Sequence, residues 1–372
     1  MRFIKLILLI FLMVLFLVFV FQNAVIVEIS FFNYKGYAPL FVLVLFSVFI
    51  GFLFAFLYFM PREWSLRRIV ENLKEGVERL NRGFFLKAEQ SFQGNPLMEA
   101  FACYSAYERE DINKLLNFSS PLCALMLLKL HHIEESQKRF ERIIEQEPEN
   151  LLALKGLRDI NFLKGNLKDA VELQERVLKN SEKWEREHQK KIMAELMASL
   201  YITSKDEDHA EKAFDIYRTP LTYSARILAY ANSGKEKDAI KLFEKSFEDG
   251  FHNQVLMILL RKEALLTKLM DIIERRRDQI NTIVLALVYL RLGLFSKVKP
   301  LLEGLPDYYR TLAVSSSSHR EEDRMCAKIL EESLKAWECV CGTRYKEYTP
   351  MCANCLRWNK IELKLFELQP LG

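Results

Sequence analysis

Two long apolar stretches dominate the hydrophobic pattern near the start of the chain. Residues 3–21 are almost continuously apolar, and residues 38–60 contain no charged side chain. A helix of about 20 apolar residues crosses a bilayer, so both stretches are long enough. A cleaved signal peptide, the alternative for the first stretch, has an apolar region of only ~7–15 residues that ends at small side chains. Because the first stretch is longer and runs into Phe21-Gln22-Asn23, we predict two transmembrane helices.

The positive charges beside these stretches predict how the chain crosses the membrane. The loop between them, residues 22–37, has Lys35 as its single cation, and Glu28 offsets this charge. Cations lie before the first stretch and after the second: Arg2, Lys5, Arg62, Arg67 and Arg68. Since basic flanks stay in the cytoplasm, we expect both termini there, with a short outer hairpin between the helices. Everything after residue 60 is then cytosolic, where thiols remain reduced.

Beyond the second stretch, apolar side chains recur at helical spacing as far as about residue 336. Pro61 is expected to end the second membrane helix, because proline lacks a backbone donor. A basic, amphipathic helix should follow it, and no convincing strand pattern appears in the middle of the chain. We predict an all-α protein in four parts: a membrane hairpin over residues 1–60, a juxtamembrane helix over 61–82, a repeat region over 83–336 and a cysteine-rich end over 337–372.

The helical middle repeats itself with a period of about 34 residues. A unit that starts at Leu151 places these residues on the signature positions of a tetratricopeptide repeat: Leu154, Leu157, Asn161, Gly165, Leu167, Ala170 and Val177. Other units start near residues 117, 191, 220 and 279, residues 254–278 form a degenerate unit, and residues 185–190 are an insertion that lengthens a first helix. Gln174 stands where phenylalanine is common. One helix pair cannot bury its apolar face but a stack can, so we predict a superhelix with a long concave surface.

The concave surface of such a superhelix is the expected binding surface for other proteins. In the two best units the first helices should line it with Leu152, Lys155, Asp159, Phe162, Ile192, Glu195 and Ser199. A co-chaperone that binds C-terminal carboxylates needs a basic clamp there. Asp159 and Glu195 argue against such a clamp, and the mixed residue types identify no ligand.

Four of the seven cysteines lie in WECVCGTRYKEYTPMCANCLRWN, residues 337–359. They form two close pairs with ten residues between them: Cys339 with Cys341, and Cys352 with Cys355. Four thiolates can surround one ion tetrahedrally, and this leaves no open position for catalysis, so we predict a structural metal, zinc rather than iron. Two disulfides are the alternative that a reducing cytosol disfavours, and a redox dithiol would need a βαβ context. The first pair has one intervening residue where two are standard.

Smaller features give further expectations. A serine run at residues 315–318 predicts a loop before a last helix over residues 321–336. Three cysteines, Cys103, Cys123 and Cys326, stand singly in helical patterns, and we expect them to be buried small apolar residues.

Charge and motifs exclude two classes of function. The first sixty residues carry three cations and one anion, so the remainder has 50 Lys and Arg against 48 Asp and Glu. That balance lacks the basic footprint of a nucleic-acid-binding protein. The sequence has no phosphate-cradling glycine loop, nucleophile elbow or HExxH motif, so we do not expect an enzyme.

The order of these parts resembles a known family. A membrane anchor, cytosolic tetratricopeptide repeats and a tail of the form Cys-x-Cys-Gly … Cys-x-x-Cys-x-x-Trp are similar to the bacterial lipopolysaccharide assembly protein B family, over residues 62–372. That family has a wider first cysteine pair and a proline where Ala353 stands here. The first sixty residues resemble the two-span lipopolysaccharide assembly protein A family, on the Gln22-Asn23 pair, Gly51 and an alternating outer loop.

The resemblance implies a fold, a site and a role. It implies a rubredoxin-like tail that holds one metal ion on Cys339, Cys341, Cys352 and Cys355. It also implies an adaptor in the bacterial inner membrane, which brings the committed-step deacetylase of lipid A synthesis to a membrane-bound AAA metalloprotease. The expected partners are these two proteins and the lipid bilayer, with no nucleic acid, and a homo-oligomer is left open. The alternative is a general membrane-tethered scaffold or co-chaperone for other clients.

Overall fold

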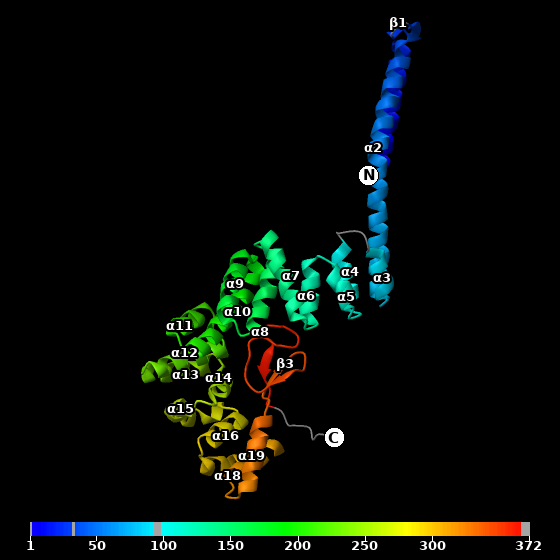
Figure 1. Cartoon of the computed structure of the whole chain (residues 1–372). Helices are drawn as coiled ribbons and strands as arrows, with labels where there is room; N and C mark the ends of the chain where they lie inside the picture. Colours follow the sequence, from blue (N-terminus) through cyan, green and yellow to red (C-terminus); the bar gives the residue numbers. More distant parts are fainter. Residues whose placement is uncertain (1, 32–33, 93–97, 366–372) are drawn as a thin grey trace. The chain divides into compact units, whose positions relative to one another are not determined.

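The computed structural model of the chain describes residues 2–31, 34–92 and 98–365. These residues are mostly helical, as the sequence predicts, and the chain divides into two compact units, Met1–Ser105 and Ala106–Gly372 (Figure 1). The first elements are α1 (Arg2–Gln22), β1 (Ile26–Phe31), β2 (Tyr34–Pro39), α2 (Leu40–Asn81) and α3 (Phe85–Phe92), and α4 (Glu99–Tyr107) includes the boundary.

A β-hairpin connects α1 and α2. β1 and β2 pair antiparallel, with Val27 opposite Ala38 and Ile29 opposite Gly36. Val27 and Ile29 are half-buried whereas Glu28 between them is exposed, which is the period-two alternation of a strand. The short connection predicted between the two helices is thus a β-hairpin, and its place outside the membrane stays a prediction.

α2 is a single helix of 42 residues, and the prediction that Pro61 ends it is wrong. Proline removes one hydrogen bond, but Pro61 is exposed and the residues on both sides are good helix formers, so the helix continues to Asn81. Among the described helices, α2 is the one that is long and apolar enough to cross a membrane. The part of α1 whose side chains the structure describes, Phe11–Gln22, is a shorter apolar helix. That α1 crosses the membrane therefore stays a prediction.

The end of α2 packs against α3. The buried Gly76 of α2 faces the ring of Phe92, and a Cβ atom at residue 76 would collide with that ring. Arg79 donates to Ser91 Oγ at 2.8 Å and to the Lys87 carbonyl at 3.1 Å. The absence of a side chain at Gly76 thus allows α3 to fold back on α2.

The second unit is a succession of helices that ends in a small sheet. Its helices are α5 (Ile112–Asn117), α6 (Pro121–Lys129), α7 (Ile133–Gln146), α8 (Leu151–Leu163), α9 (Leu167–Asn180), α10 (Lys183–Ser204), α11 (Glu207–Ile216), α12 (Pro220–Asn232), α13 (Glu236–Glu248), α14 (His252–Leu259), α15 (Glu263–Arg275), α16 (Thr282–Arg291), α17 (Phe295–Val298), α18 (Asp307–Ser317) and α19 (Glu321–Ser333). The strands are β3 (Trp337–Cys339), β4 (Arg344–Tyr345) and β5 (Ile361–Leu363).

The helices stack as pairs, which confirms the predicted repeat. α8 packs on α9, α10 on α11 and α12 on α13, and first helices pack on first helices from α10 through α12, α14 and α16 to α18. Gly165 closes the turn of the first of these pairs at φ +78°, a conformation that favours glycine. The insertion lengthens α10 to 22 residues, as expected. The degenerate unit is the pair α14 and α15, in which the first helix is shortened to 8 residues.

Local side chains fix the ends of several helices. Asn150 accepts a hydrogen bond from the Ala153 amide at the start of α8, and Thr219 and Thr222 form a capping box at the start of α12. The predicted loop at residues 315–318 is wrong for its first three serines, which lie in the last turn of α18. Ser317 Oγ donates back to the Val314 carbonyl at 2.9 Å, so this hydroxyl bonds within the last turn of the helix. The last helix, expected to reach residue 336, ends at Ser333.

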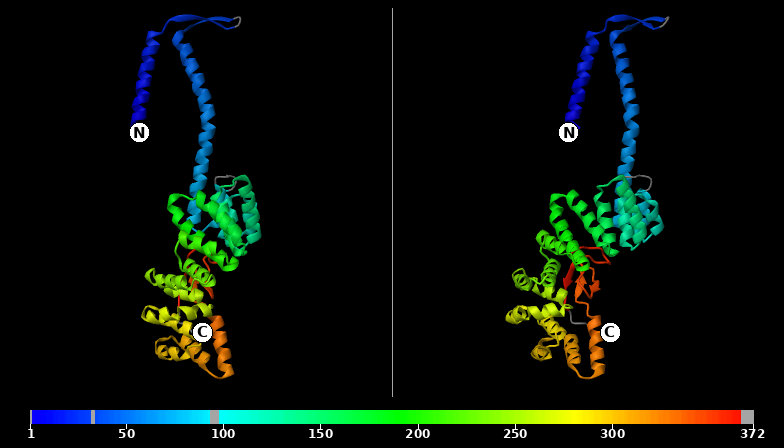
Figure 2. Two further views of the ribbon diagram at one scale, coloured as in Figure 1. Left: turned by 90° about the vertical axis from the view of Figure 1, so that its left-hand side faces the viewer. Right: turned by 60° about the vertical axis from the view of Figure 1, so that its left-hand side comes forward.

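The cysteine-rich end forms a three-stranded antiparallel sheet in the order β4-β3-β5. We call residues 337–365 the knuckle. Figures 1 and 2 show its strands on the inner side of the curve that α8 to α19 describe. Its side chains belong to the same buried clusters as the helices: Trp337, Cys339, Cys352 and Ile361 in one, Met351 and Trp358 in another. The knuckle is thus a part of the core of this unit.

Candidate metal centre and its docking face

The four cysteines predicted as metal ligands come together at one point of the knuckle. The Sγ atoms of Cys339, Cys341, Cys352 and Cys355 all lie within 4.8 Å of one another. Cys339 and Cys355 are 3.5 Å apart, and Cys341 and Cys352 are 3.6 Å apart, so the contacts join the two sequence pairs crosswise. Four sulfurs at this spacing match the donor set of a tetrahedral metal site.

A tight turn brings the first pair together despite its single intervening residue. Gly342 has φ +85°, and its amide donates to the Cys339 carbonyl at 2.8 Å. The Cys339 amide donates to the Thr343 carbonyl at 2.9 Å, which closes the turn from the other side. Val340, the intervening residue, remains 56% exposed, so its side chain is directed away from the core.

Hydroxyl groups surround the sulfurs where the short pair leaves few amide donors. Tyr345 donates its hydroxyl to Cys352 Sγ at 3.0 Å and accepts a hydrogen bond from the Ala353 amide at 2.9 Å. Thr343 Oγ1 lies 3.2 Å from Cys341 Sγ. The Cys355 amide adds a contact to Cys352 Sγ at 3.5 Å. Donors around metal-bound thiolates orient them and stabilise their charge.

The pKa values of the thiols differ in direction. The Thr343 hydroxyl lowers the pKa of Cys341 to about 6. Burial opposes ionisation of Cys352, but the Cys355 amide and the Tyr345 hydroxyl together lower its pKa. Burial raises the pKa of Cys355 to about 12 and also raises that of Cys339. A cation bound among the four sulfurs would favour ionisation of all of them, so this donor set fits a metal ion.

The second unit presents a docking face to the knuckle, which we define by Arg158, Asp159, Phe162, Glu195 and Arg261. These residues come from α8 and α10, with Arg261 just after α14. Each of them contacts a knuckle side chain, as the following contacts show.

Trp358 is the first anchor of the knuckle on this face. Its indole Nε1 donates to Asp159 Oδ1 at 2.8 Å. Its ring lies 5.0 Å from the Phe162 ring, and the Arg158 guanidinium lies 5.0 Å from the Trp358 ring on a cation–π contact. Trp358 is only 5% exposed, so these contacts are largely shielded from water.

Tyr348 and Asn359 form the second anchor, at Glu195 of α10. The Tyr348 hydroxyl donates to Glu195 Oε1 at 3.1 Å, and the Asn359 amide, oriented with its nitrogen toward α10, donates to both carboxylate oxygens. Tyr348 also packs edge-on against Trp337, with ring centroids 4.9 Å apart. At the rim, Arg261 pairs with the exposed Glu347.

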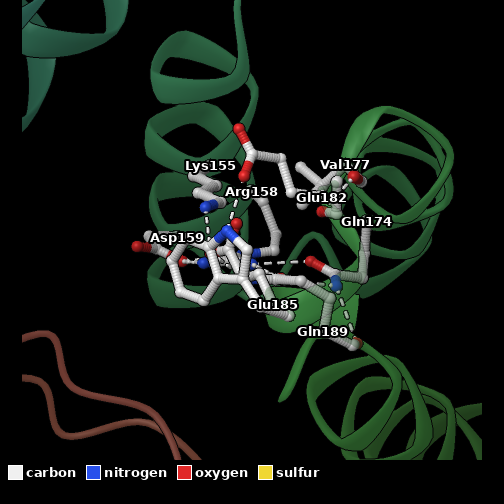
Figure 3. Close-up of polar contacts among 10 residues, drawn as sticks. Lys155, Arg158, Asp159, Gln174, Val177, Glu182, Glu185 and Gln189 are labelled. Atoms are coloured by element: carbon white, nitrogen blue, oxygen red, sulfur yellow. Dashed lines mark hydrogen bonds and ion pairs between the residues drawn. The ribbon is translucent and has the colours of Figure 1, made fainter. Parts of the chain in front are cut away.

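A buried polar network holds Arg158 and Asp159 in place (Figure 3). Arg158 donates to Asp159 at 2.8 Å and to Gln174 at 2.6 Å, and Gln174 donates to the Gln189 carbonyl at 2.9 Å. Arg158 is 3% exposed and Gln174 is fully buried. Gln174 therefore replaces the common phenylalanine of the repeat because it supports a buried arginine. The sequence analysis noted this unusual glutamine, but it did not identify Arg158 as its hydrogen-bond partner.

The residues predicted to line an open binding surface have several different roles. Asp159, Phe162 and Glu195 contact the knuckle, so the chain's own C-terminal end covers part of that surface. Lys155 pairs with Glu185, and Ser199 Oγ donates to the Glu195 carbonyl at 2.8 Å. The remaining two are packed among helices, Ile192 buried and Leu152 half-buried. The sequence analysis placed these residues on the correct helices, but it did not predict that the knuckle covers part of their surface.

The single cysteines behave in two ways. Cys103 and Cys123 are completely buried, as expected, but both are disulfide-bonded, so the prediction that they are single apolar thiols is wrong. Cys326 of α19 is exposed, so the prediction that it is buried is wrong. Only Ala327 of α19 is buried among the described residues, so the helix turns a narrow face to the core and Cys326 lies outside that face.

Comparison with known proteins gives a domain match and remote structural likenesses. In the crystal structure of a tetratricopeptide repeat protein from Parabacteroides merdae, 99% of that chain aligns with 71% of this one, at 11% sequence identity and a TM-score of 0.35. A search of curated proteins found no match. The model of the lipopolysaccharide assembly protein A domain matches residues 22–83. The similar stretch thus runs from the end of α1 through the β-hairpin and the whole of α2, further along the chain than the sixty residues expected from the sequence.

Proposed function

We propose that the chain is a membrane-anchored adaptor that regulates lipopolysaccharide synthesis. The observation that carries this proposal is the likeness of residues 22–83 to the lipopolysaccharide assembly protein A domain. The same chain carries stacked helix pairs and a four-cysteine cluster. Their order is the one that resembles the lipopolysaccharide assembly protein B family.

The adaptor brings the committed-step deacetylase of lipid A synthesis to a membrane-bound AAA metalloprotease. α2 runs without a break from its apolar half to Asn81, so in this proposal the helix that spans the bilayer also tethers the residues that follow it. Anchoring in the membrane of the protease raises the effective concentration of a bound client beside that protease. Both termini lie in the cytoplasm of a bacterial inner membrane in this proposal, which follows the positive charges that flank the apolar stretches.

A structural zinc ion on Cys339, Cys341, Cys352 and Cys355 completes the proposed adaptor. The ion, when bound, cross-links the two turns of the knuckle. Folding of the knuckle then places Trp358 and Tyr348 on the docking face, which makes the shape of that face dependent on the metal. The chain's own residues do the recognition, and the ion has no part in catalysis.

The test is the half-life of the deacetylase in cells with and without the chain. We expect a several-fold longer half-life when the gene is deleted, and restoration by the wild-type chain. A chain that lacks residues 1–60 should restore it poorly, because the client then meets the protease only by diffusion. An unchanged half-life after deletion, together with recovery of unrelated clients from native membranes, would favour the general scaffold instead.

A further inference from the structure

Glu195 is an acidic side chain placed in the interface between the knuckle and the helices. It is 1% exposed and lies on α10, one of the helices that pack against the knuckle. Its contacts across the interface are the Tyr348 hydroxyl and the Asn359 amide, both neutral donors. We propose that the proton on the Glu195 carboxyl controls whether the knuckle stays on the docking face, so that the face is covered at mildly acidic pH and is freed as the pH rises.

The two acidic side chains of the docking face differ in how they are compensated. Asp159 lies 2.6 Å from the Arg158 guanidinium, so its negative charge has a buried positive partner. Glu195 has Thr219, Tyr348 and Asn359 as hydrogen-bond partners, and the one cation that acts on it is Lys191, a turn earlier on its own helix, among the described residues. An ionised carboxylate in a dry interface without a paired cation is unfavourable.

The energetics follow from this placement. Burial raises the pKa of Glu195 from 4.5 to about 7 while the knuckle is docked. Release of the knuckle exposes the carboxyl and returns its pKa toward the ordinary value. Docking therefore takes up a proton between these two values, and the contribution of Glu195 to docking is complete at low pH and is lost as the pH rises through about 7. The docking equilibrium constant should fall about tenfold between pH 6 and pH 8.

Among the other titratable groups near the interface, Asp159 has a pH dependence of the same sign, because burial raises its pKa despite the Arg158 guanidinium beside it. His188, two turns earlier on α10, has its pKa lowered by burial, so its protonation would weaken the buried state as the pH falls. The pH dependence that His188 gives to docking is therefore opposite in direction to that of Glu195. Burial raises the pKa of Tyr348 well above its ordinary value, so this phenol stays protonated throughout the range.

The experiment follows Trp358 by fluorine NMR in the zinc-loaded full chain labelled with 5-fluorotryptophan. Trp184 is 79% exposed and serves as an internal reference. Urea titrations at pH 6, 7 and 8 give the midpoint for release of Trp358, and circular dichroism on the same samples gives the midpoint for loss of helix. We expect release before helix loss, with the release constant rising about tenfold from pH 6 to pH 8. Retained zinc, measured in each sample, separates release from loss of metal.

Two variants test whether the titration of Glu195 causes the pH dependence of knuckle release. Glu195→Gln keeps the shape of the side chain and removes its titration, so its release constant should change much less with pH than that of the wild type. Glu347→Gln removes a carboxylate from the rim of the same interface, where the side chain is 66% exposed, and should keep the wild-type slope. A pH-independent wild type, an unchanged slope in Glu195→Gln, or coincident release and helix loss would each overturn the proposal. The measurement needs neither deacetylase nor protease, so its outcome is separate from that of the proposed function.

Discussion

Single side chains fix the knuckle on the docking face, and Trp358 makes the most varied contacts there. We expect Trp358→Phe to lower the free energy of knuckle docking by about 1–3 kcal/mol, because the buried Asp159 loses the indole donor. Urea titration followed by near-ultraviolet circular dichroism measures this loss. Trp184→Phe, at a 79% exposed position, is the matched control and should change the titration little.

A second residue-scale prediction concerns the donors around the sulfurs. Tyr345→Phe removes the hydroxyl that lies 3.0 Å from Cys352 Sγ and leaves the ring in place. Groups that orient metal ligands commonly contribute 10–100-fold in affinity, so we expect zinc to be held about tenfold more weakly. Competition with a chromophoric chelator measures this. Tyr308→Phe, whose hydroxyl contacts the Leu330 carbonyl in α19, is the control, and an equal loss in both variants would argue against the assigned role.

Helix packing at the scale of elements depends on one close approach between α7 and α8. The Phe140 ring is completely buried and lies over Gly156, where an added Cβ atom would collide with it. We expect Gly156→Ala to destabilise the second unit by about 1–3 kcal/mol despite the better helix propensity of alanine. Gly304→Ala is the control, because the nearest atom to its Cβ would be 4.0 Å away. Thermal unfolding of both variants beside the wild type tests this, and equal midpoints would contradict the packing argument.

The element-scale pattern was largely predictable from the sequence, because helix pairs follow from local periodicity and turn residues. Gly165 and the 34-residue spacing located α8 and α9, since both depend on neighbours along the chain. Pro61 was misleading because a proline is a local signal, and the good helix formers on both sides outweigh it. The serines of α18 were misleading for a similar reason, since the hydroxyl of Ser317 bonds back to the helix.

The candidate site was predictable only where its residues are close in sequence. The cysteine pairs have ten residues between them, and their spacing identified all four sulfurs. The docking face joins Asp159 to Trp358, which are 199 residues apart, and no local pattern encodes that contact. Buried Gln174 was a partial signal, because a polar side chain at an apolar repeat position requires a buried polar partner.

At the scale of the whole molecule, the proposed metal site is coupled to the stacked helices through the knuckle. Cys339 and Cys352 belong to the same buried cluster as α12 to α19, so loss of the metal should loosen the knuckle and expose the docking face. The repeats have their own packing between first helices and should stay helical. We therefore expect Cys352→Ser to lose zinc and the near-ultraviolet signal of Trp358 while most of the far-ultraviolet helix signal remains.

Cys326→Ser is the matched control for this change, because Cys326 is exposed on α19 and is not one of the four clustered cysteines. Metal analysis should find one zinc per chain in this control and in the wild type, and less than a tenth of that in Cys352→Ser. In cells, the control should keep the deacetylase short-lived whereas Cys352→Ser should lengthen its half-life as far as deletion of the gene does. Full zinc content in Cys352→Ser would exclude these cysteines as the metal site. Zinc loss with an unchanged half-life would separate the knuckle from the adaptor role, because the repeats alone would then be sufficient to hold the client.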